Sequence, residues 1–531
     1  IIEHGTVEWR ALTGGANGIL NIPSPSLLGY EFRERDIAIL SILVAALALA
    51  LFRNLSLSPW GRAMRAVRDA ETAAQSLGLN PVTIRTIAFG LSAVAAGAAG
   101  ALFAPLSSFI SPSSFSFFQS ILFLLVVMVG GSGSTIGPLV GAVVVVLLPE
   151  ALASLSEYRP LIYGVLLFAV LLLAPRGLVG LVENWRRNQA KGAKSRTNAL
   201  AALDRPRETH TLVIAGLSKS FGGLRAVAEV GFEVKPGRIT SLIGPNGAGK
   251  TTVLNLTCGF YRPDHGSVRL GPTELAGRPS HAVARAGLAR TYQTSQLFAQ
   301  MSVVDNVLAG LRGPRLGSFA KALFWPEDET ALRARAEALL GFVGYGGAMN
   351  APAASLPHVD RRLVEIARAL AAEPRVLLLD EPAAGLMQAD KARLGALLRR
   401  IAESGIAVLL VEHDMQLVMG LSQHVVVLDA GRCIAAGSPA QVQADPAVRK
   451  AYLGEGEMAG RGRSAAYQTG ETVLDVRDLA VAYGQIEALH GVSLSVGRGE
   501  MVGVLGANGA GKSTLMRALS GLHRPRAGDI R

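Results

Sequence analysis

Two glycine-rich strings in this sequence carry the residue types that hold a chain of phosphates. Residues 244–252 read GPNGAGKTT, and residues 506–514 read GANGAGKST. In such loops glycines let backbone N–H groups turn towards the phosphates, the lysine reaches the β- and γ-phosphates, and the Ser or Thr hydroxyl binds Mg²⁺. The positions expected to bind ATP are therefore Gly244, Asn246, Gly247, Gly249, Lys250, Thr251 and Thr252, together with Gly506, Asn508, Gly509, Gly511, Lys512, Ser513 and Thr514.

Polar residues that could act on a bound phosphate follow two later apolar runs. Val376–Leu379 leads to Asp380 and Glu381, and Val408–Val411 leads to His413. Asp380 is expected to hold Mg²⁺, and Glu381 to orient or deprotonate the attacking water. His413 is a candidate γ-phosphate contact, although a lone histidine after a strand is also a common structural residue. The predicted catalytic residues are Glu381, His413 and Gln293, and the predicted metal ligands are Thr251, Gln293, Asp380 and Ser513.

The elements around the two strings repeat. Lys250 and Lys512 lie 262 positions apart (512 − 250), and about sixty surrounding residues align at this offset without a gap. The runs Ile239–Ile243 and Met501–Leu505 precede the loops and are predicted to be buried parallel strands. Phe221 and Tyr483 also correspond, and each is a candidate for stacking on adenine, with a core aromatic residue as the alternative.

The first third of the chain is predicted to cross a membrane. Residues 86–149 contain no Asp, Glu, Lys, Arg or His, and a bilayer-spanning helix needs about 20 mostly apolar residues. Five spans are expected, near 37–54, 84–106, 116–130, 136–155 and 160–175. Arginines at 53–85 and basic residues from 176 onward place both segments in the cytoplasm. Because the chain starts without Met, further spans are expected before residue 1.

Charge and cysteine content argue against two other classes of function. The net charge is +12, but much of the arginine excess lies beside the spans, where cytoplasmic bias explains it, so no nucleic-acid partner is expected. Cys258 and Cys433 are far apart and form no metal-binding pattern.

The predicted fold is multi-domain, with a helical transmembrane segment followed by an α/β P-loop domain and the start of a second one. The domains are 1–187 (about five spans, N-terminally incomplete), 210–454 and a truncated 471–531. Polar or glycine-rich linkers at 188–209 and 455–470 separate them.

The ordered motifs resemble those of ABC transporters, and more closely those of branched-chain amino acid importers. The resemblance is carried by residues 356–370 (LPHVDRRLVEIARAL), 380–386 (DEPAAGL) and 434–454 in the ATPase, and by 13–18 (TGGANG) and 61–78 in the permease. It implies a permease fused to an ATPase in the cytoplasmic (inner) membrane, with ATP and Mg²⁺ as cofactors. It also implies that residues 61–78 dock on the ATPase, for which a solvated loop is the alternative.

The resemblance implies import of branched-chain or related small amino acids, with amides such as urea as competing cargo. The implied partners are a second permease subunit, a complete second ATP-binding domain, an extracytoplasmic substrate-binding protein and membrane lipid. A membrane-anchored regulatory ATPase without cargo is the alternative from another class, and an exporter fits less well. Pro357, His358, Val359 and Asp360 depart from the family's signature, and Met387 stands where Asp is usual, which puts one of two composite ATP sites in doubt.

Overall fold

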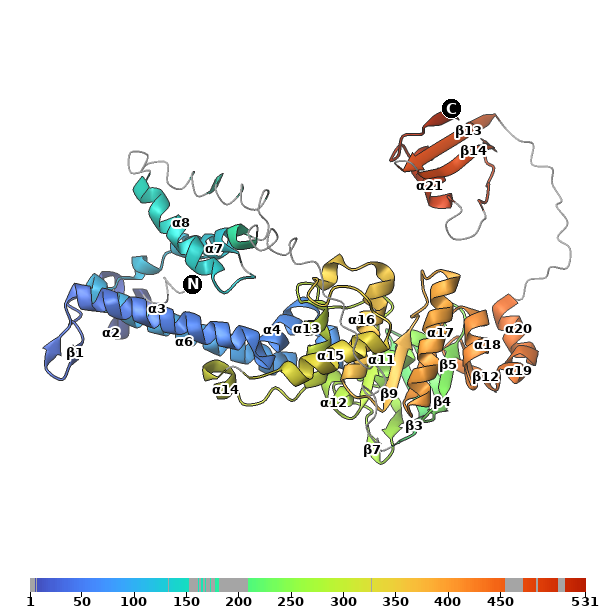
Figure 1. Cartoon of the computed structure of the whole chain (residues 1–531), viewed down its shortest axis with the longest axis horizontal. Coiled ribbons are helices and arrows are strands. Elements are labelled where there is room, and N and C mark those ends of the chain that lie inside the picture. The colour runs from blue at the N-terminus through green and yellow to red at the C-terminus, as the bar shows by residue number, and fades with distance from the viewer. Residues whose placement is uncertain are drawn as a thin grey trace. The chain divides into compact units, whose positions relative to one another are not determined.

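The chain divides into two compact units, Ile1–Gly454 and Glu455–Arg531, shown by residue number in Figure 1. The structure is a computed structural model. It describes residues 5–151 except 6 and 132, scattered helical residues within 161–180, residues 209–453 except 326, and residues 471–531 except 484–485 and 505–510. The linkers predicted at 188–209 and 455–470 lie outside these ranges, apart from residue 209.

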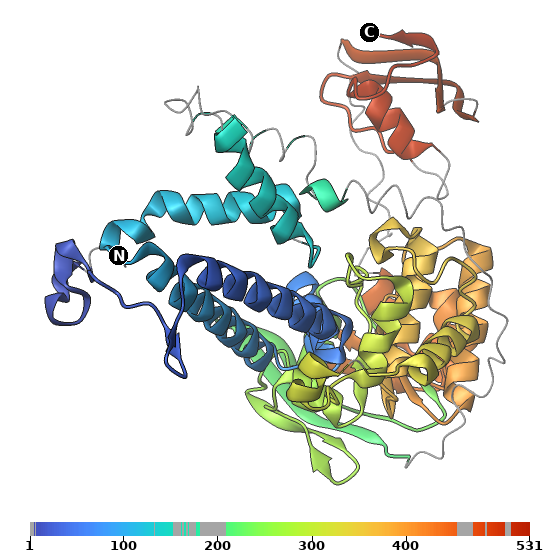
Figure 2. The ribbon, with the colours of Figure 1, turned by 60° about the vertical axis from the view of Figure 1, so that its left-hand side comes forward.

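Two long apolar helices, α3 (Glu34–Leu57) and α6 (Pro81–Ser107), occur where spans 37–54 and 84–106 are predicted. Both are long and apolar enough to cross a bilayer. They lie side by side in both views of the ribbon (Figures 1 and 2), and most of their side chains are exposed. Such exposure suits helices whose outer faces contact lipid.

Two shorter apolar helices, α7 (Phe117–Gly130) and α8 (Gly137–Ala151), follow at the next two predicted spans. They pack closely, since a Cβ on Gly141 would lie 1.9 Å from the carbonyl oxygen of Val126. Such close contact through small residues is typical of membrane helices, whereas Gly133 faces open space. The span predicted at 160–175 lies largely outside the described residues.

Between α3 and α6, the chain forms two short helices, α4 (Pro59–Asp69) and α5 (Glu71–Ser76). Helix α4 begins at Ser58, whose hydroxyl accepts a hydrogen bond from the N–H of Gly61, and Pro59 suits its first turn. The buried face of the two helices packs on Phe298 and Met301 of the following domain. Segment 61–78 is therefore docked rather than solvated, on the side predicted to be cytoplasmic.

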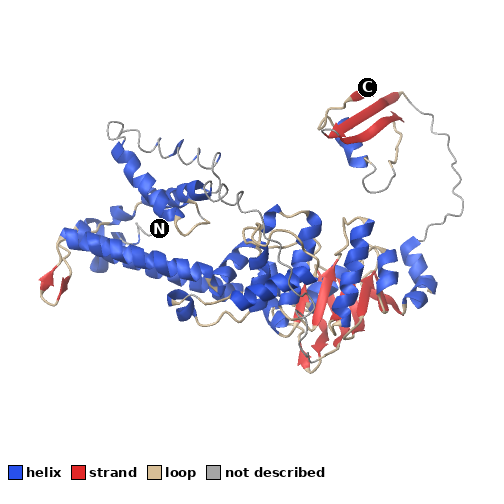
Figure 3. Ribbon diagram, viewed as in Figure 1, coloured by secondary structure: helices blue, strands red, loops and turns tan. Residues whose placement is uncertain are grey.

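A six-stranded sheet forms the centre of the α/β domain, with strands in the order β12-β11-β5-β10-β9-β8 (Figure 3). All pairs are parallel except β11–β12. The apolar runs before the functional residues become β5 (Ile239–Ile243), β9 (Val376–Asp380) and β10 (Ala407–Val411), and all three are buried throughout. Because parallel strands end at one edge, loop 244–249, Asp380 and His413 come together there.

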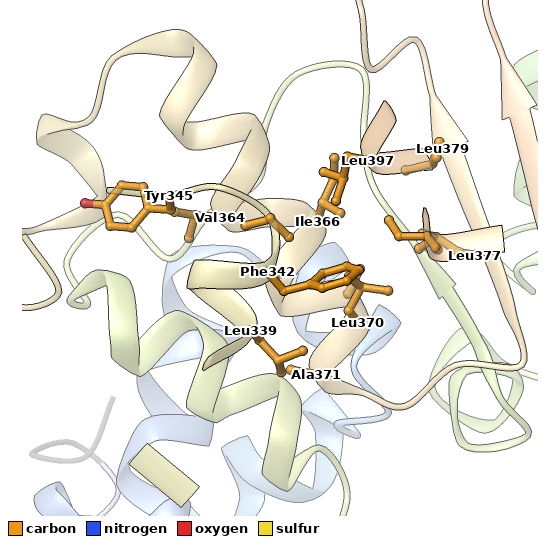
Figure 4. Close-up of a cluster of buried hydrophobic side chains, with 14 of the residues drawn as sticks. Leu339, Phe342, Tyr345, Val364, Ile366, Leu370, Ala371, Leu377, Leu379 and Leu397 are labelled. Carbon is orange, nitrogen blue, oxygen red and sulfur yellow. The ribbon is translucent and has the colours of Figure 1, made fainter. Parts of the chain in front are cut away.

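Helices and a second sheet cover the central one. The antiparallel sheet runs β4-β3-β6-β7, and its apolar residues share a core with β5 and β9. On the other side, α15 (Thr330–Phe342), α16 (His358–Ala371) and α17 (Gln388–Glu403) pack on β9. Figure 4 shows this core, in which Phe342 and Leu370 face Leu377 of β9.

The remaining elements have the following bounds: α2 Arg10–Thr13, β1 Ser26–Leu27, β2 Tyr30–Glu31, β3 Leu212–Phe221, β4 Leu224–Val234, α11 Lys250–Thr257, β6 His265–Leu270, β7 Thr273–Glu274, α12 Ser280–Arg285, β8 Leu288–Arg290, α13 Val303–Arg312, α14 Phe319–Phe324, α18 Met415–Leu421, β11 His424–Asp429, β12 Arg432–Gly437, α19 Pro439–Ala444 and α20 Pro446–Leu453. Short 3₁₀ turns lie at Gly15–Asn17, Pro112–Phe115 and Ala353–Ser355.

The second unit repeats the start of the first at the predicted offset. It consists of β13 (Thr472–Tyr483), β14 (Ile486–Gly497), α21 (Lys512–Leu519) and β15 (Ala527–Ile530), with strands ordered β14-β13-β15. The strand predicted at Met501–Leu505 is wrong for residues 501–504, which are irregular and exposed. Its counterpart β5 pairs with β10 and β11, and the described part of 471–531 contains no counterpart of either strand.

Candidate functional site

The first glycine-rich loop joins β5 to α11 and has the backbone of a phosphate cradle. Gly244, Gly247 and Gly249 have positive φ angles of 151°, 84° and 95°, which L side chains rarely adopt. At Gly249, directly before α11, a Cβ would also lie 2.6 Å from the carbonyl oxygen of Ala226. The loop therefore presents its N–H groups and the positive end of α11 to the same space.

Lys250 folds back across this loop. Its Nζ donates to the carbonyl oxygens of Gly244, at 2.8 Å, and Pro245, at 2.9 Å. Burial lowers the pKa of Lys250, and the nearby carboxylates of Glu381 and Asp380 oppose this shift. A phosphate chain would give the ammonium group the charged partner that two carbonyl oxygens do not supply.

The three predicted catalytic residues meet at one carboxylate. Gln293 Nε2 donates to Glu381 Oε2 at 2.8 Å, and His413 Nε2 lies 2.5 Å from Glu381 Oε1. Glu381 itself has a left-handed backbone, with φ of 46°, held by its N–H donating to Val411 at 2.8 Å. Strain of this kind is frequent at active sites, and here it sets the carboxylate between the ends of β9 and β10.

Asp380 is held by an arginine that the sequence reasoning missed. Arg290 Nη2 donates to Asp380 Oδ2 at 2.9 Å, and both side chains are almost fully buried. Arg290 Nη1 also donates to Asn255 of α11, at 2.5 Å, and its guanidinium lies 5.2 Å from the ring centre of Tyr292. The sequence carried no signal for this pair, because only the fold shows that Arg290 is buried and which carboxylate it reaches.

Two further charged residues hold the catalytic loops in place. Arg362 Nη2 donates to the carbonyl oxygen of Gln293 at 2.6 Å, and its Nη1 donates to that of Tyr292. Glu412 accepts hydrogen bonds from the N–H groups of Ala383 and His413, while burial raises its pKa. Both are buried side chains that fix backbone rather than face the cleft.

The glycine-rich loop and the three predicted catalytic residues line a cleft of about 460 Å³. Its lining includes Asn246–Thr252, Gln293, Glu381 and His413. Phe221 is not among the lining residues; its ring packs edge-on against Tyr261, with centres 5.2 Å apart, and is 41% exposed. The two rings form an exposed aromatic pair, and Tyr261 was not anticipated from the sequence.

The donors in this cleft suit Mg²⁺. Hydroxyl, carboxylate and amide oxygens are the ligands that this ion prefers, usually combined with substrate phosphates. Thr251, Gln293 and Asp380 supply one of each at a single sheet edge. No group of three or more His, Cys, Asp or Glu side chains that could hold a metal occurs among the described residues.

In the second copy, Gly511 has a φ of 88° and precedes α21, as Gly249 precedes α11. Lys512 and Thr514 lie in the first turn of α21. Gly506, Asn508 and Gly509 lie outside the described residues, as do the side chains of Ser513 and Tyr483.

Comparisons with known proteins match both halves of the chain. A family described as the permease component of branched-chain amino acid transport systems matches residues 5–175. The ABC transporter family matches 227–384 and 489–531, and a branched-chain amino acid ATP-binding cassette family matches 432–457. Over 251 residues, the chain is 42% identical to the high-affinity branched-chain amino acid transport ATP-binding protein BraF of Pseudomonas aeruginosa, covering 46% of this chain and 98% of BraF.

The chain belongs to the branched-chain amino acid family of ABC transporters. LivG of Escherichia coli K12, with the same descriptive name, is 41% identical over 252 residues and is covered to 98%. A solved nucleotide-free ATP-binding cassette of an ABC transporter is 30% identical and covered completely, at 46% of this chain and a TM-score of 0.42. The family resemblance and fold class predicted from the sequence are confirmed, and the permease match makes this a membrane protein.

The signature segment of this ABC transporter begins α16 in an unusual way. Pro357 precedes the helix and has no N–H to offer, and His358 hydrogen-bonds through Nε2 to the carbonyl oxygen of Ala384 at 3.1 Å. Val359 packs against the helical core. Asp360 lies near Tyr345, whose pKa is raised to about 12 by burial and by that carboxylate.

Proposed function

We propose that this chain is a component of an ATP-driven importer that moves branched-chain or related small amino acids across the cytoplasmic membrane. The observation that carries the proposal is that segment 61–78, between two membrane-length helices, lies on the ATPase beside the loop of Gln293. A membrane anchor would need no such contact. The cargo follows from the family and from relatives described as amino acid transport proteins.

Each residue of the cleft has a proposed role in hydrolysis. Lys250 and the loop N–H groups bind the phosphates, while Phe221 offers a ring to adenine. Glu381 accepts the proton of the attacking water or orients it, and His413 and Gln293 hold that carboxylate from either side. Mg²⁺, held by Thr251, Asp380 and Gln293, would neutralise charge on the phosphates.

The proposed coupling path passes through Tyr292, the neighbour of Gln293. Its hydroxyl donates to the carbonyl oxygen of Thr72 at 2.9 Å, so the Ser76 hydroxyl, 2.5 Å away, acts as donor to it. Nearby, the carboxylate of Asp69 accepts from the N–H of Gln300 at 3.1 Å. A displacement of segment 61–78 would thus pull on the loop that also holds Glu381.

A complete transporter needs the implied partners: a second permease subunit, a second ATPase domain that closes head to tail on the first, and an external substrate-binding protein. Signature residues of one domain contact the γ-phosphate held by the other. Pro357 has no N–H to donate, and Asp360 brings a negative charge towards the phosphates. We therefore propose that the ATP facing them is hydrolysed slowly. The ATP held by Lys250 faces the signature of the second domain. We also propose a multi-pass topology, with the domain limits given above.

Vesicles distinguish this function from the regulatory alternative. We expect leucine, presented with its binding protein, to stimulate ATP hydrolysis by the assembled complex in proteoliposomes. Urea in place of leucine is the matched control for the competing cargo. ATPase activity indifferent to every small-molecule cargo would favour an anchored regulatory ATPase.

A further inference from the structure

Helix α14 of the ATPase lies against the predicted cytoplasmic end of α3 in the permease. The side chain of Asn54, near the end of α3, donates through Nδ2 to the carbonyl oxygen of Leu323 at 3.2 Å. Trp60 donates through Nε1 to Gly317 at 3.2 Å, and its ring packs edge-on against Phe319 with centres 5.4 Å apart. These contacts fix residues 317–323 against the end of α3 and the start of α4.

The charged residues of α3 and α6 indicate where this contact lies relative to the bilayer. Arg53 ends the charge-free run 37–52, and Arg85 precedes the charge-free run that starts at Thr86. Both arginines are exposed, and arginines at span ends extend their charge to the membrane surface. Asn54 directly follows Arg53, so Leu323 lies at the cytoplasmic surface of the bilayer.

Two large aromatic side chains, Phe324 and Trp325, directly follow Leu323 and are exposed. Phe324 is 53% exposed and Trp325 is 68% exposed, and their ring centres lie 5.9 Å apart. Residues 313–325 carry Arg315 and Lys321, both exposed. Of the acidic residues that follow, Glu327 pairs with Arg312 and Glu329 with Arg62. Asp328 is exposed. The exposed aromatics do not fit a water-facing helix, whereas aromatic rings next to basic groups are typical of membrane interfaces.

We propose that residues 319–325 form an interfacial anchor, in which Phe324 and Trp325 enter the inner leaflet and Lys321 contacts anionic headgroups. The anchor gives the ATPase a direct hold on the lipid surface, in addition to its contact with segment 61–78. It does not depend on the cargo or on the rate of hydrolysis. The occupant is lipid rather than protein because the aromatics adjoin the cytoplasmic end of a membrane-length helix. The charge left after the ion pairs, Arg315 and Lys321 against Asp328, is also net positive.

The fluorescence of Trp325 tests this proposal. The chain is assembled with its partner subunits in nanodiscs of phosphatidylcholine and phosphatidylglycerol, with bromine placed either near the headgroups or deep in the acyl chains. The difference between wild type and Trp325→Phe isolates the emission of Trp325. We expect this emission to be quenched, more strongly by the shallow bromine, and to be blue-shifted relative to a water-exposed indole.

A tryptophan elsewhere on the ATPase provides the matched control. Glu403 is exposed and ends α17, so Glu403→Trp in the Trp325→Phe background should not respond to bromine. Lys321→Glu should weaken the quenching of Trp325 in discs that contain phosphatidylglycerol. Unquenched Trp325 that an aqueous quencher reaches freely would overturn the proposal. Trp325 shielded from both quenchers would also overturn it and assign the surface to a protein partner.

Discussion

Glu381 combines a left-handed backbone with a carboxylate held by an amide and an imidazole. If it is the general base, Glu381→Gln should keep ATP binding and lower turnover by about 10²–10⁴-fold. The measurement is phosphate release by the assembled complex, with ATP binding followed separately. Glu403→Gln, a change at the end of α17, is the control. Hydrolysis at the wild-type rate in the Glu381→Gln complex would show that the base is another group.

Lys250 contributes a different kind of interaction, a charge placed where phosphates would lie. Lys250→Ala should nearly abolish nucleotide binding at the first site, since the carbonyl oxygens that now accept from Nζ cannot attract an anion. Binding of a labelled ATP analogue is compared between Lys512→Ala and Lys512→Ala with Lys250→Ala, so that only the first site is read. Equal binding by the two variants would contradict the assignment.

At the scale of elements, the hydroxyl of Tyr292 makes two of the hydrogen bonds between segment 61–78 and the loop that follows β8. Tyr292→Phe keeps the ring beside Arg290 but removes two hydrogen bonds to the segment, each contributing about 0.5–1.5 kcal/mol. We expect cargo-stimulated ATPase activity to fall several-fold, while basal hydrolysis changes little. Stimulation assays in proteoliposomes measure both.

The matched control for this variant is Tyr345→Phe. Tyr345 is also a buried tyrosine with its pKa raised to about 12, and its hydroxyl donates to Ala348 within the ATPase. It should leave stimulation unchanged. An equal loss in both variants would mean that the hydroxyl of Tyr292 supports the domain rather than the coupling.

The start of α16 carries a second prediction at this scale. Val359→Gly with Asp360→Gln removes a branched side chain and a negative charge from the helix start, so hydrolysis at the Lys512 site should rise. The change is made in a complex already disabled by Glu381→Gln, which leaves only that site to be read. No increase would count against inequality of the two sites.

For the whole molecule, the sequence predicted the parts that are local or periodic. The loop around Lys250 was readable because its glycines and lysine serve one chemistry, and the repeat reappears in α21 and β15. Charge-free apolar runs predicted α3, within 37–52, and α6, within 86–149. The strand prediction at Met501–Leu505 was wrong for residues 501–504 because a central strand needs partners that are distant in sequence, as β10 and β11 are for β5. A local apolar pattern does not show whether such partners are present.

The side chains that hold the site residues in place could not be predicted from the sequence either. Arg290 reaches Asp380 across 90 positions, and Arg362 reaches Gln293 across 69. Neither spacing has a periodic signature, because tertiary folding alone brings the partners together. The same reason hid the approach of Trp60 and Asn54 to α14.

The central claim is that ATP hydrolysis in this chain drives amino acid import through segment 61–78. Uptake of labelled leucine by proteoliposomes that contain the assembled complex and its binding protein tests it most directly. We predict uptake that requires ATP on the side of the ATPase, is lost with Glu381→Gln, and is not competed by urea. Leucine uptake that continues at the wild-type rate without ATP or with Glu381→Gln would contradict the account.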